Sequence, residues 1–329
     1  MIMDKYYLLY FFVFILSLFL TTVIEANLIP RLKRRASQPI YEGGPSWHMS
    51  KSGTPTMGGL AFIIAIGVAT LAVSLLYFFS DESEAAISIL LIFGYSCINA
   101  IIGLVDDLTK LKRKENAGLT PMQKLLFQLL CAVAFLFVRY MLFGDRTELC
   151  FGNFKAELGF LYYPFSVIVL LGTVNCANLT DGLDGLAGSV ALTAGCSLFF
   201  ISSLGSNDVA AVSVALVGGM LGFLIFNINP AKIFMGDVGS LFLGGIIASS
   251  AYALGSPLLI LFVGIVYFIE GLSVILQVLY FKITKKRLFK MAPFHHHLEK
   301  CGFSETKICM IAIIVTLLFS TPAYLIFGS

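Results

Sequence analysis

The chain has 329 residues, of which 58% are hydrophobic and only 12% are charged, and its formal net charge at pH 7 is +3. A soluble domain usually carries about a quarter charged residues, so this composition excludes an ordinary water-soluble protein and indicates an integral membrane protein. The seven cysteines are scattered through mostly apolar stretches and form no CxxC pair, which argues against a disulfide framework and against a zinc site.

Ten stretches of the chain are long and apolar enough to cross a bilayer, which requires about 20 predominantly apolar residues. The first stretch is too long for a signal-peptide core and lacks a small-residue cleavage site, so we expect it to be retained. No repeat or linker divides the chain, and we predict an all-α integral membrane protein with a single domain over residues 1–329. The predicted spans are residues 6–29, 55–79, 85–105, 122–143, 160–177, 185–204, 209–228, 239–255, 258–281 and 306–327.

Lysine and arginine set the predicted orientation, because cytoplasmic loops carry an excess of both. Eighteen of the 22 basic residues fall in segments that these spans place on one side of the membrane, which we assign to the cytoplasm. Loops on the other side contain Asp81, Glu82, Glu84 and Asp208 without basic residues, and both termini are predicted to lie outside. The cytoplasmic segments are residues 31–51, 106–124, 178–184, 229–238 and 282–307.

The unusual polar motifs all fall on this predicted cytoplasmic face, which suggests one composite site rather than separate solvated turns. They are SKSGTPTMGG (50–59), VDDLTK (105–110), NLTDGLDG (178–185), NPAKIFMGDVGS (229–240) and MAPFHHHLEK (291–300).

Asp106 and Asp107 stand at the predicted end of the third span, where carboxylates are either functional or simply hydrated. Lys110 lies one helical turn from Asp106 and could offset its charge or hold a phosphate. If residues 178–185 are helical, Asp181 and Asp184 share one face and repel each other unless a cation or a donor-rich ligand lies between them. Glycines at the same interval favour close approach of a ligand or, alternatively, packing between helices.

Asp237 opens the eighth span, where an acidic residue ordinarily caps a helix. A helix N-terminus beside glycines also binds anions, and a carboxylate that shares such a site with phosphate needs a metal ion between them. Oxygen ligands together with phosphates favour Mg²⁺. We therefore weigh a magnesium site against a simple cap.

The histidines His295, His296 and His297 are consecutive, so their rings cannot all face one metal ion. We expect one or two of them to donate hydrogen bonds to phosphate or to exchange protons. The basic run at residues 282–290 also suits lipid headgroups. Glu270, in the middle of the ninth span, is a candidate functional acid, although a hydrogen bond between helices would account for it equally well.

Carboxylates, lysines, histidines and glycine-rich helix ends on one face are the groups that phosphoryl transfer requires. A site at the membrane edge further suggests a lipid substrate. A transporter is the main alternative from another class, but transporters place their sites near the midplane and often show repeats. The clustering of the motifs at one face disfavours that alternative.

In order, and over nearly the whole chain, five motifs resemble those of the bacterial phospho-N-acetylmuramoyl-pentapeptide transferases, also called translocase I. These motifs are GTPTMGG (53–59), GLVDDLTK (103–110), NLTDGLDGLA (178–187), FNINPAKIFMGDVGSLFLG (226–244) and MAPFHHHLEK (291–300). The HHH segment resembles this family rather than the related transferases of N-acetylglucosamine phosphate to polyprenyl phosphate, which remain the closest alternative. One departure is NINPAK, where an aromatic residue is expected before the proline.

The resemblance implies ten spanning helices in the bacterial plasma membrane, a homodimer, a cytoplasmic active-site cleft and a requirement for Mg²⁺. The implied reaction transfers phospho-MurNAc-pentapeptide from UDP-MurNAc-pentapeptide to undecaprenyl phosphate, giving lipid I and UMP. The lipid bilayer is a further expected partner, and nucleic acid is not. Whether the transfer takes one step or passes through a covalent aspartyl intermediate is left open.

Roles carried over from the family fall into three groups. Asp237 matches the magnesium ligand, and Asp106 and Asp107 match the acidic pair, in which Asp106 is the proposed base on the lipid phosphate. The uridine pocket, in which Phe234 would stack on uracil, is matched by Asn178, Asp181, Gly182, Leu183, Asp184 and Phe234. The polar positions that line the cleft are matched by Lys51, Lys110, Lys124, Asn227, His295 and His296. Of these, His296 is also counted among the catalytic residues.

Overall fold

The computed structural model describes residues 2–33, 51, 53–113, 118–144, 147–152, 154–203 and 205–327, with side chains from Tyr6 onward. Most of the predicted cytoplasmic segment 31–51, and residues 114–117 of segment 106–124, lie outside the described residues.

Helices make up most of the described chain, and one two-stranded hairpin is the only sheet among the described residues. The prediction of an all-α protein is thus confirmed apart from this hairpin. The elements are α1 (Ile2–Lys33), α2 (Gly59–Phe78), α3 (Ser83–Arg113), α4 (Pro121–Phe143), β1 (Glu148–Phe151), β2 (Phe154–Glu157), η2 (Gly159–Leu161), α5 (Tyr162–Thr180), α6 (Leu186–Ser202), α7 (Asn207–Asn227), α8 (Gly236–Ala253), η3 (Pro257–Leu259), α9 (Ile260–Val263), α10 (Ile265–Thr284), α11 (Phe294–Lys300) and α12 (Glu305–Phe327).

Eight helices within the described residues are long and apolar enough to cross a membrane, which agrees with an integral membrane protein. They are α1 to α5, α7, α10 and α12. Two further predicted spans coincide with α6 and α8, which fall short of that standard. The reason is clear for α8, because every residue from Val238 to Tyr252 is buried. A helix that faces other helices rather than lipid can contain many small and hydroxyl-bearing residues, and the count of ten spans stays a prediction.

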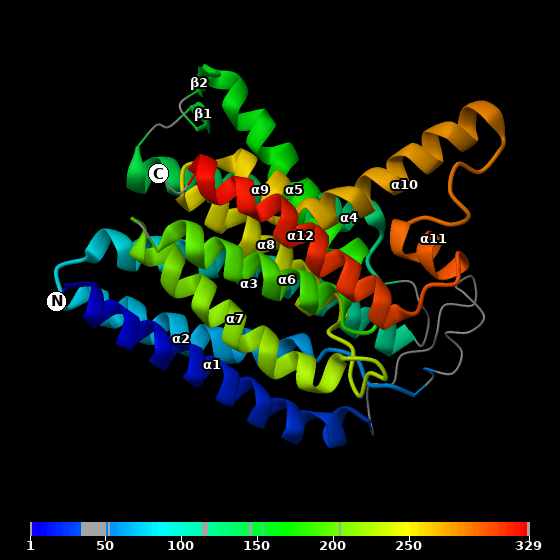
Figure 1. Cartoon of the computed structure of the whole chain (residues 1–329), viewed down its shortest axis with the longest axis horizontal. Coiled ribbons are helices and arrows are strands. Elements are labelled where there is room, and N and C mark those ends of the chain that lie inside the picture. The colour runs from blue at the N-terminus through cyan, green and yellow to red at the C-terminus, as the bar shows by residue number, and fades with distance from the viewer. Residues whose placement is uncertain are drawn as a thin grey trace.

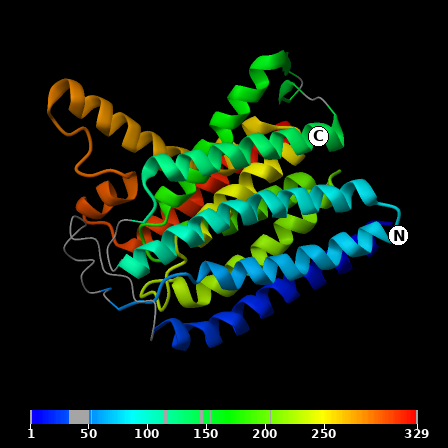
Figure 2. The same cartoon turned by 180° about the vertical axis from the view of Figure 1, so that it is seen from behind.

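The bundle is built around α8, which packs against α3 on one side and α5 on another. Seen from behind, α1, α2, α3 and α4 lie side by side in chain order across one face (Figure 2). On the other face α7 packs against α1 and α6, and α10 projects away from the bundle, while α11 lies between its outer part and the bundle (Figure 1). Apolar side chains at the outer surface, such as Phe137 and Ile168, suit contact with lipid.

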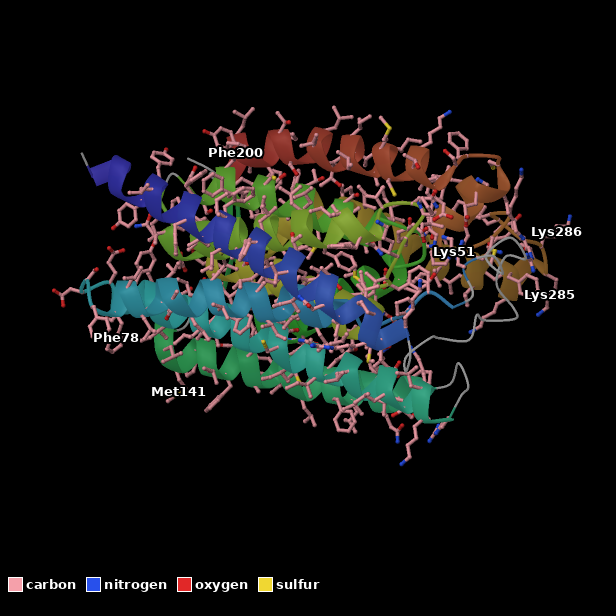
Figure 3. All side chains as sticks on the ribbon, turned by 90° about the horizontal axis from the view of Figure 1, so that it is seen from below. Lys51, Phe78, Met141, Phe200, Lys285 and Lys286 are labelled. Atoms are coloured by element: carbon pink, nitrogen blue, oxygen red, sulfur yellow. The ribbon has the colours of Figure 1, made fainter. Side chains whose placement is uncertain are left out.

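The two ends of the bundle differ in chemistry. Lys51, Lys285 and Lys286 lie toward one end of the long axis, and Phe78 and Phe200 lie toward the other (Figure 3). The lysine-bearing end is the end on which the polar motifs were predicted to converge.

Two predicted boundaries are wrong in ways that matter for the site. The third span was expected to end at residue 105, but α3 continues to Arg113, so Asp106 and Asp107 lie about two turns inside a helix. Basic residues in its last turn favour this extension, because they interact well with a helix C-terminus. The ninth span was expected to be continuous, but the helix is interrupted at Gly264, between α9 and α10.

Candidate active site

A backbone pairing holds the start of α8 in place. Phe234 N–H donates to Pro55 O at 2.8 Å, and Gly58 N–H donates to Phe234 O at 2.9 Å. The motif at residues 53–59 is therefore the structural partner of the motif at residues 226–244. This pairing fixes the position of Asp237, one residue after α8 begins.

Close contact between α3 and α8 brings three carboxylates together. A Cβ atom built on Gly103 would lie 2.2 Å from the carbonyl oxygen of Asp237, so only glycine allows α8 to begin this close to α3. One turn further along α3 stand Asp106 and Asp107, and Val238 N–H donates to Asp107 Oδ2 at 3.1 Å. Oxygen atoms of Asp106, Asp107 and Asp237 lie within 4.8 Å of one another. We call these three residues the aspartate cluster.

Two lysines neutralise part of the charge of the aspartate cluster. Lys110 Nζ lies 2.6 Å from Asp106 Oδ2 and 3.1 Å from Asp237 Oδ2. Lys124 Nζ lies 2.5 Å from the same oxygen of Asp237. The predicted pairing of Lys110 with Asp106 is thus confirmed. When all three carboxylates are ionised, the two ammonium groups leave one negative charge.

The aspartate cluster fits a divalent cation. Asp106 and Asp107 are 2% and 1% exposed, and Asp107 Oδ1 accepts no hydrogen bond from the described residues. Its nearest cation is Lys110 Nζ at 3.8 Å. A buried carboxylate oxygen without a partner is costly, and an all-oxygen donor set with few carboxylates suits Mg²⁺. Asn178, expected in a uridine pocket, lies beside this cluster and donates to Asp237 Oδ1 at 3.0 Å.

Asp181 and Asp184 do not share a helix face, because α5 ends at Thr180 and residues 181–185 form a turn. The conditional expectation of a helix here is wrong. Gly185, with a φ of +81°, ends the turn and begins α6. Burial and the negative charges of Asp237 and Asp107 raise the pKa of Asp181 to about 8, so this carboxyl group lies within the electric field of the aspartate cluster.

Asp184 is enclosed by partners from other segments. Lys51 Nζ lies 2.7 Å from its Oδ1, and Asn229 Nδ2 and Ala231 N–H donate to its Oδ2 at 3.1 and 3.0 Å. Glu305 Oε2 accepts from Asp184 N–H at 2.8 Å and lies 2.7 Å from Lys51 Nζ. The residue therefore ties several loops together. The sequence did not reveal Glu305, because an acidic residue at a helix start is expected for the helix dipole alone.

The remaining predicted pocket residues support the same loops. Asn227 is buried and accepts from Gly185 N–H at 3.0 Å through Oδ1 while its Nδ2 donates to Ile233 O at 2.8 Å. Leu183 is buried, and the Phe234 side chain is half-buried. Gly182 faces the ring of His295.

The three histidines of α11 face three different partners, as their consecutive positions predicted. His295 is buried beside Glu270, with Nδ1 3.1 Å from Oε2. His296 Nδ1 lies 2.7 Å from Glu299 Oε2. His297 Nδ1 accepts from the backbone N–H of Lys290 at 3.1 Å. A shared metal site is therefore excluded for these rings.

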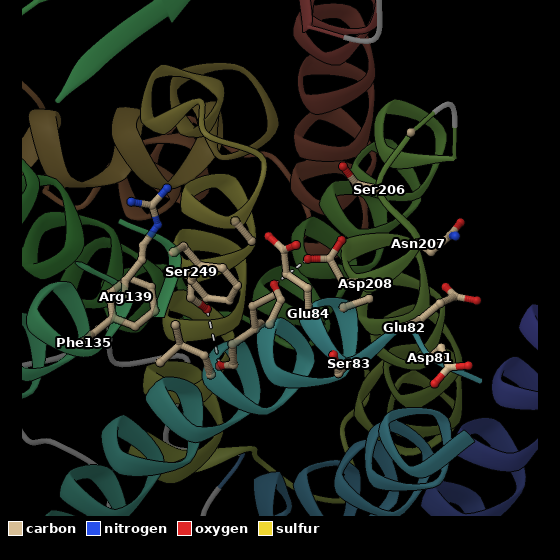
Figure 4. A pocket seen from close by; sticks show the side chains of 17 residues that line it. Asp81, Glu82, Ser83, Glu84, Phe135, Arg139, Ser206, Asn207, Asp208 and Ser249 are labelled. Carbon is tan, nitrogen blue, oxygen red and sulfur yellow. Dashed lines mark hydrogen bonds between the residues drawn. The ribbon is translucent and has the colours of Figure 1, made fainter. Parts of the chain in front are cut away.

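A pocket of about 560 Å³, shown from close by in Figure 4, is lined by the starts of α3 and α7 and so lies at the end of the bundle opposite the aspartate cluster. Its lining includes Glu84, Arg139 and Asp208, and it contains none of the predicted site residues. The aspartate cluster and the 181–185 turn are thus distinct from it.

Comparisons with known proteins agree with these motifs. The family model described as glycosyl transferase family 4 matches residues 88–255, and the phospho-N-acetylmuramoyl-pentapeptide-transferase signature 1 matches residues 51–63. The chain is 44% identical over 301 residues to a phospho-N-acetylmuramoyl-pentapeptide-transferase of Clostridium botulinum (strain Alaska E43 / Type E3), with 90% of each chain covered.

Two further relatives carry the same name. The one from Clostridium perfringens (strain 13 / Type A) is 41% identical over 312 residues, covering 94% of this chain and 96% of the relative. The one from Staphylococcus carnosus (strain TM300) is 42% identical over 312 residues, covering 92% and 95%. The chain therefore belongs to the phospho-N-acetylmuramoyl-pentapeptide-transferase family, within glycosyl transferase family 4.

Proposed function

We propose that this chain transfers phospho-N-acetylmuramoyl-pentapeptide from UDP-MurNAc-pentapeptide to undecaprenyl phosphate, giving lipid I and UMP in the first membrane step of peptidoglycan synthesis. Family membership makes it a transferase of peptidoglycan synthesis in a bacterial membrane. At the level of residues, the proposal is carried by one observation, the gathering of Asp106, Asp107 and Asp237 with two lysines at one end of a membrane bundle.

The aspartate cluster is proposed to hold Mg²⁺, with Asp237 as the principal ligand. When bound, the ion would neutralise phosphate charge and polarise a phosphoryl oxygen. Lys110 and Lys124 lie within 4 Å of the same carboxylates and are proposed to hold the remaining phosphate oxygens. Their short ion pairs with Asp237 support this role, because ammonium groups placed there need no reorganisation to meet an anion.

Asp106 is proposed to orient the lipid phosphate and to take its residual proton. The contacts that support this role are the Leu119 N–H bond to Asp106 Oδ1 at 2.8 Å and the Lys110 ion pair, which together fix the carboxylate. A phosphate monoester has a second pKa near 6, so a weak base is sufficient. Asp106→Asn should therefore lower turnover more than binding of the UDP-linked substrate, and equal losses in both would contradict the role.

The nucleotide half of the site is proposed to lie along residues 178–184, with Phe234 against uracil. Asn178 and Asp181 are proposed to meet the nucleotide, while Asp184 shapes the loop, because its own oxygens already have three partners. Lys51, Asn227, His295 and His296 are proposed to line the cleft. The same proposal includes a cytoplasmic position for the end of the bundle that carries the aspartate cluster. It also includes ten membrane spans, termini on the outside and a homodimer.

The decisive experiment measures UMP release by the purified protein supplied with UDP-MurNAc-pentapeptide, undecaprenyl phosphate and Mg²⁺. We expect release that depends on all three and is abolished in Asp237→Asn. Replacement of the UDP-linked substrate by UDP-GlcNAc should stop the reaction. Release with UDP-GlcNAc alone would assign the chain to the related sugar-phosphate transferases, and no release under any condition would refute the proposal.

A further inference from the structure

Glu270 of α10 and His295 of α11 form a buried pair between these two helices. Glu270 is 4% exposed and His295 is 1% exposed. The backbone N–H of His295 lies 3.2 Å from each carboxylate oxygen of Glu270, and His295 Nδ1 lies 3.1 Å from Oε2. The Glu270 carboxylate accepts from the backbone N–H of His295 and lies against the Nδ1 edge of its ring, although neither ring nitrogen makes a hydrogen bond with the described residues. The backbone bonds and the close packing of the carboxylate therefore set the position of the ring.

The opposite edge of the His295 ring faces the 181–185 turn. Its Nε2 makes no hydrogen bond with the described residues, and a Cβ atom built on Gly182 would lie 2.3 Å from it. Position 182 can therefore hold only glycine while the ring keeps this place. His295 packs directly against the turn that carries Asp181.

The neighbouring residue of α10 contacts α5, from which the same turn emerges. A Cβ atom built on Gly271 would lie 2.2 Å from Cys176 Sγ. The contacts therefore close a ring that runs from α5 through the turn to His295, on to Glu270 and Gly271, and back to Cys176. In such a ring the turn cannot move away from α5 without breaking a buried contact.

We propose that Glu270 is a positioning residue for the half of the site that binds the UDP-linked substrate. It orients His295, and the ring of His295 holds the 181–185 turn in register with Asn178, whose Nδ2 donates to Asp237 Oδ1. This inference rests on the proposed function, because it assumes that the turn contacts the nucleotide. The proposal predicts different effects on the two substrates. Loss of Glu270 should weaken binding of the UDP-linked substrate and leave binding of undecaprenyl phosphate unchanged.

The test compares purified full-length wild type, Glu270→Ala and Glu270→Gln by initial rates of UMP release, with each substrate varied in turn. In Glu270→Ala we expect KM for UDP-MurNAc-pentapeptide to rise at least tenfold while KM for undecaprenyl phosphate stays within twofold. Glu270→Gln keeps an oxygen for the His295 N–H and should recover part of that loss. Equal changes in both KM values, or no change, would overturn the proposal. Wild type that releases no UMP would refute the proposed function instead.

A double-mutant cycle tests the contact between ring and turn even where Glu270→Ala does not fold. Gly182→Ala places a methyl group against the His295 ring, and His295→Ala removes that ring. We expect Gly182→Ala to weaken binding of UDP, measured by calorimetry, and the double variant to bind UDP more tightly than Gly182→Ala alone. Losses that simply add in the double variant would show that ring and turn act independently, and the proposal would fail.

Discussion

Replacement of Gly103 by alanine should disable the aspartate cluster without touching any of its side chains. The new Cβ would lie 2.2 Å from the carbonyl oxygen of Asp237, 2.4 Å from its carbonyl carbon and 2.6 Å from Val238 N. These are backbone atoms, which cannot rotate away. Ordinary contact begins at 3.4 Å, so α3 and α8 must separate by about 3.4 − 2.2 = 1.2 Å, or on the order of 1 Å after local relaxation.

A separation of that size acts across the cluster, because Asp106 and Asp107 belong to α3 and Asp237 belongs to α8. The Val238 N–H bond to Asp107 Oδ2, now 3.1 Å, would stretch toward about 4 Å and be lost. Misplacement of reacting groups by about 1 Å costs on the order of 100-fold in rate, which corresponds to about 3 kcal/mol of activation free energy.

The assay is the initial rate of UMP release at saturating substrates, with the unfolding temperature of each variant measured alongside. Gly94→Ala is the matched control, since Gly94 lies on the same helix and a Cβ there meets nothing within 4 Å. We expect Gly94→Ala to keep activity within twofold of wild type and to unfold at the same temperature or slightly higher. A Gly103→Ala variant that folds and keeps more than a third of wild-type activity would refute the reasoning.

Three further outcomes follow from the site. Mg²⁺ should raise the unfolding temperature of wild type in a concentration-dependent way, and Asp237→Asn should abolish this shift; a shift that survives the substitution would place the ion elsewhere. Lys51→Met leaves the buried Asp184 carboxylate without its cation and should lower stability by about 1–3 kcal/mol in chemical denaturation, whereas Glu148→Gln, in an exposed pair at 3.6 Å, should leave it unchanged. Because the pKa of Asp181 is raised to about 8 in the folded state, the folded protein binds more protons than the unfolded chain between about pH 4 and pH 8, so this group makes stability fall as pH rises through that window. In a metal-free melting series, Asp181→Asn should flatten that decline, and identical slopes would contradict the assignment.

The sequence located most helices well, because the thickness of a bilayer sets the length of apolar stretch that a spanning helix needs. It failed where a helix continues beyond the apolar stretch. Residues 106–113 are mostly polar or charged, yet they continue α3 as regular helix, since lysine, arginine and leucine are good helix formers whatever their hydropathy. The hairpin at residues 148–157 was missed because its strands have only four residues each.

The sequence predicted which motifs form the site, but it did not predict which side chains pair with one another. Asp106, Asp107, Lys110, Lys124 and Asp237 were all named, and they do lie together. Pattern alone could not tell that Asp184 is paired with Lys51 and Glu305, because such partners are separated in sequence by more than a hundred residues. Those pairings are set by how the helices pack.

The enclosed position of α8 also constrains how the protein is made. Both α3 and α5 leave the ribosome before α8, and α8 must end up packed against each of them. The earlier helices therefore cannot close on each other when they enter the membrane, and a nascent chain that stops before residue 236 contains an unfilled gap. Because Asp237 lies at the start of α8, the arrival of this one helix both fills the gap between α3 and α5 and completes the aspartate cluster.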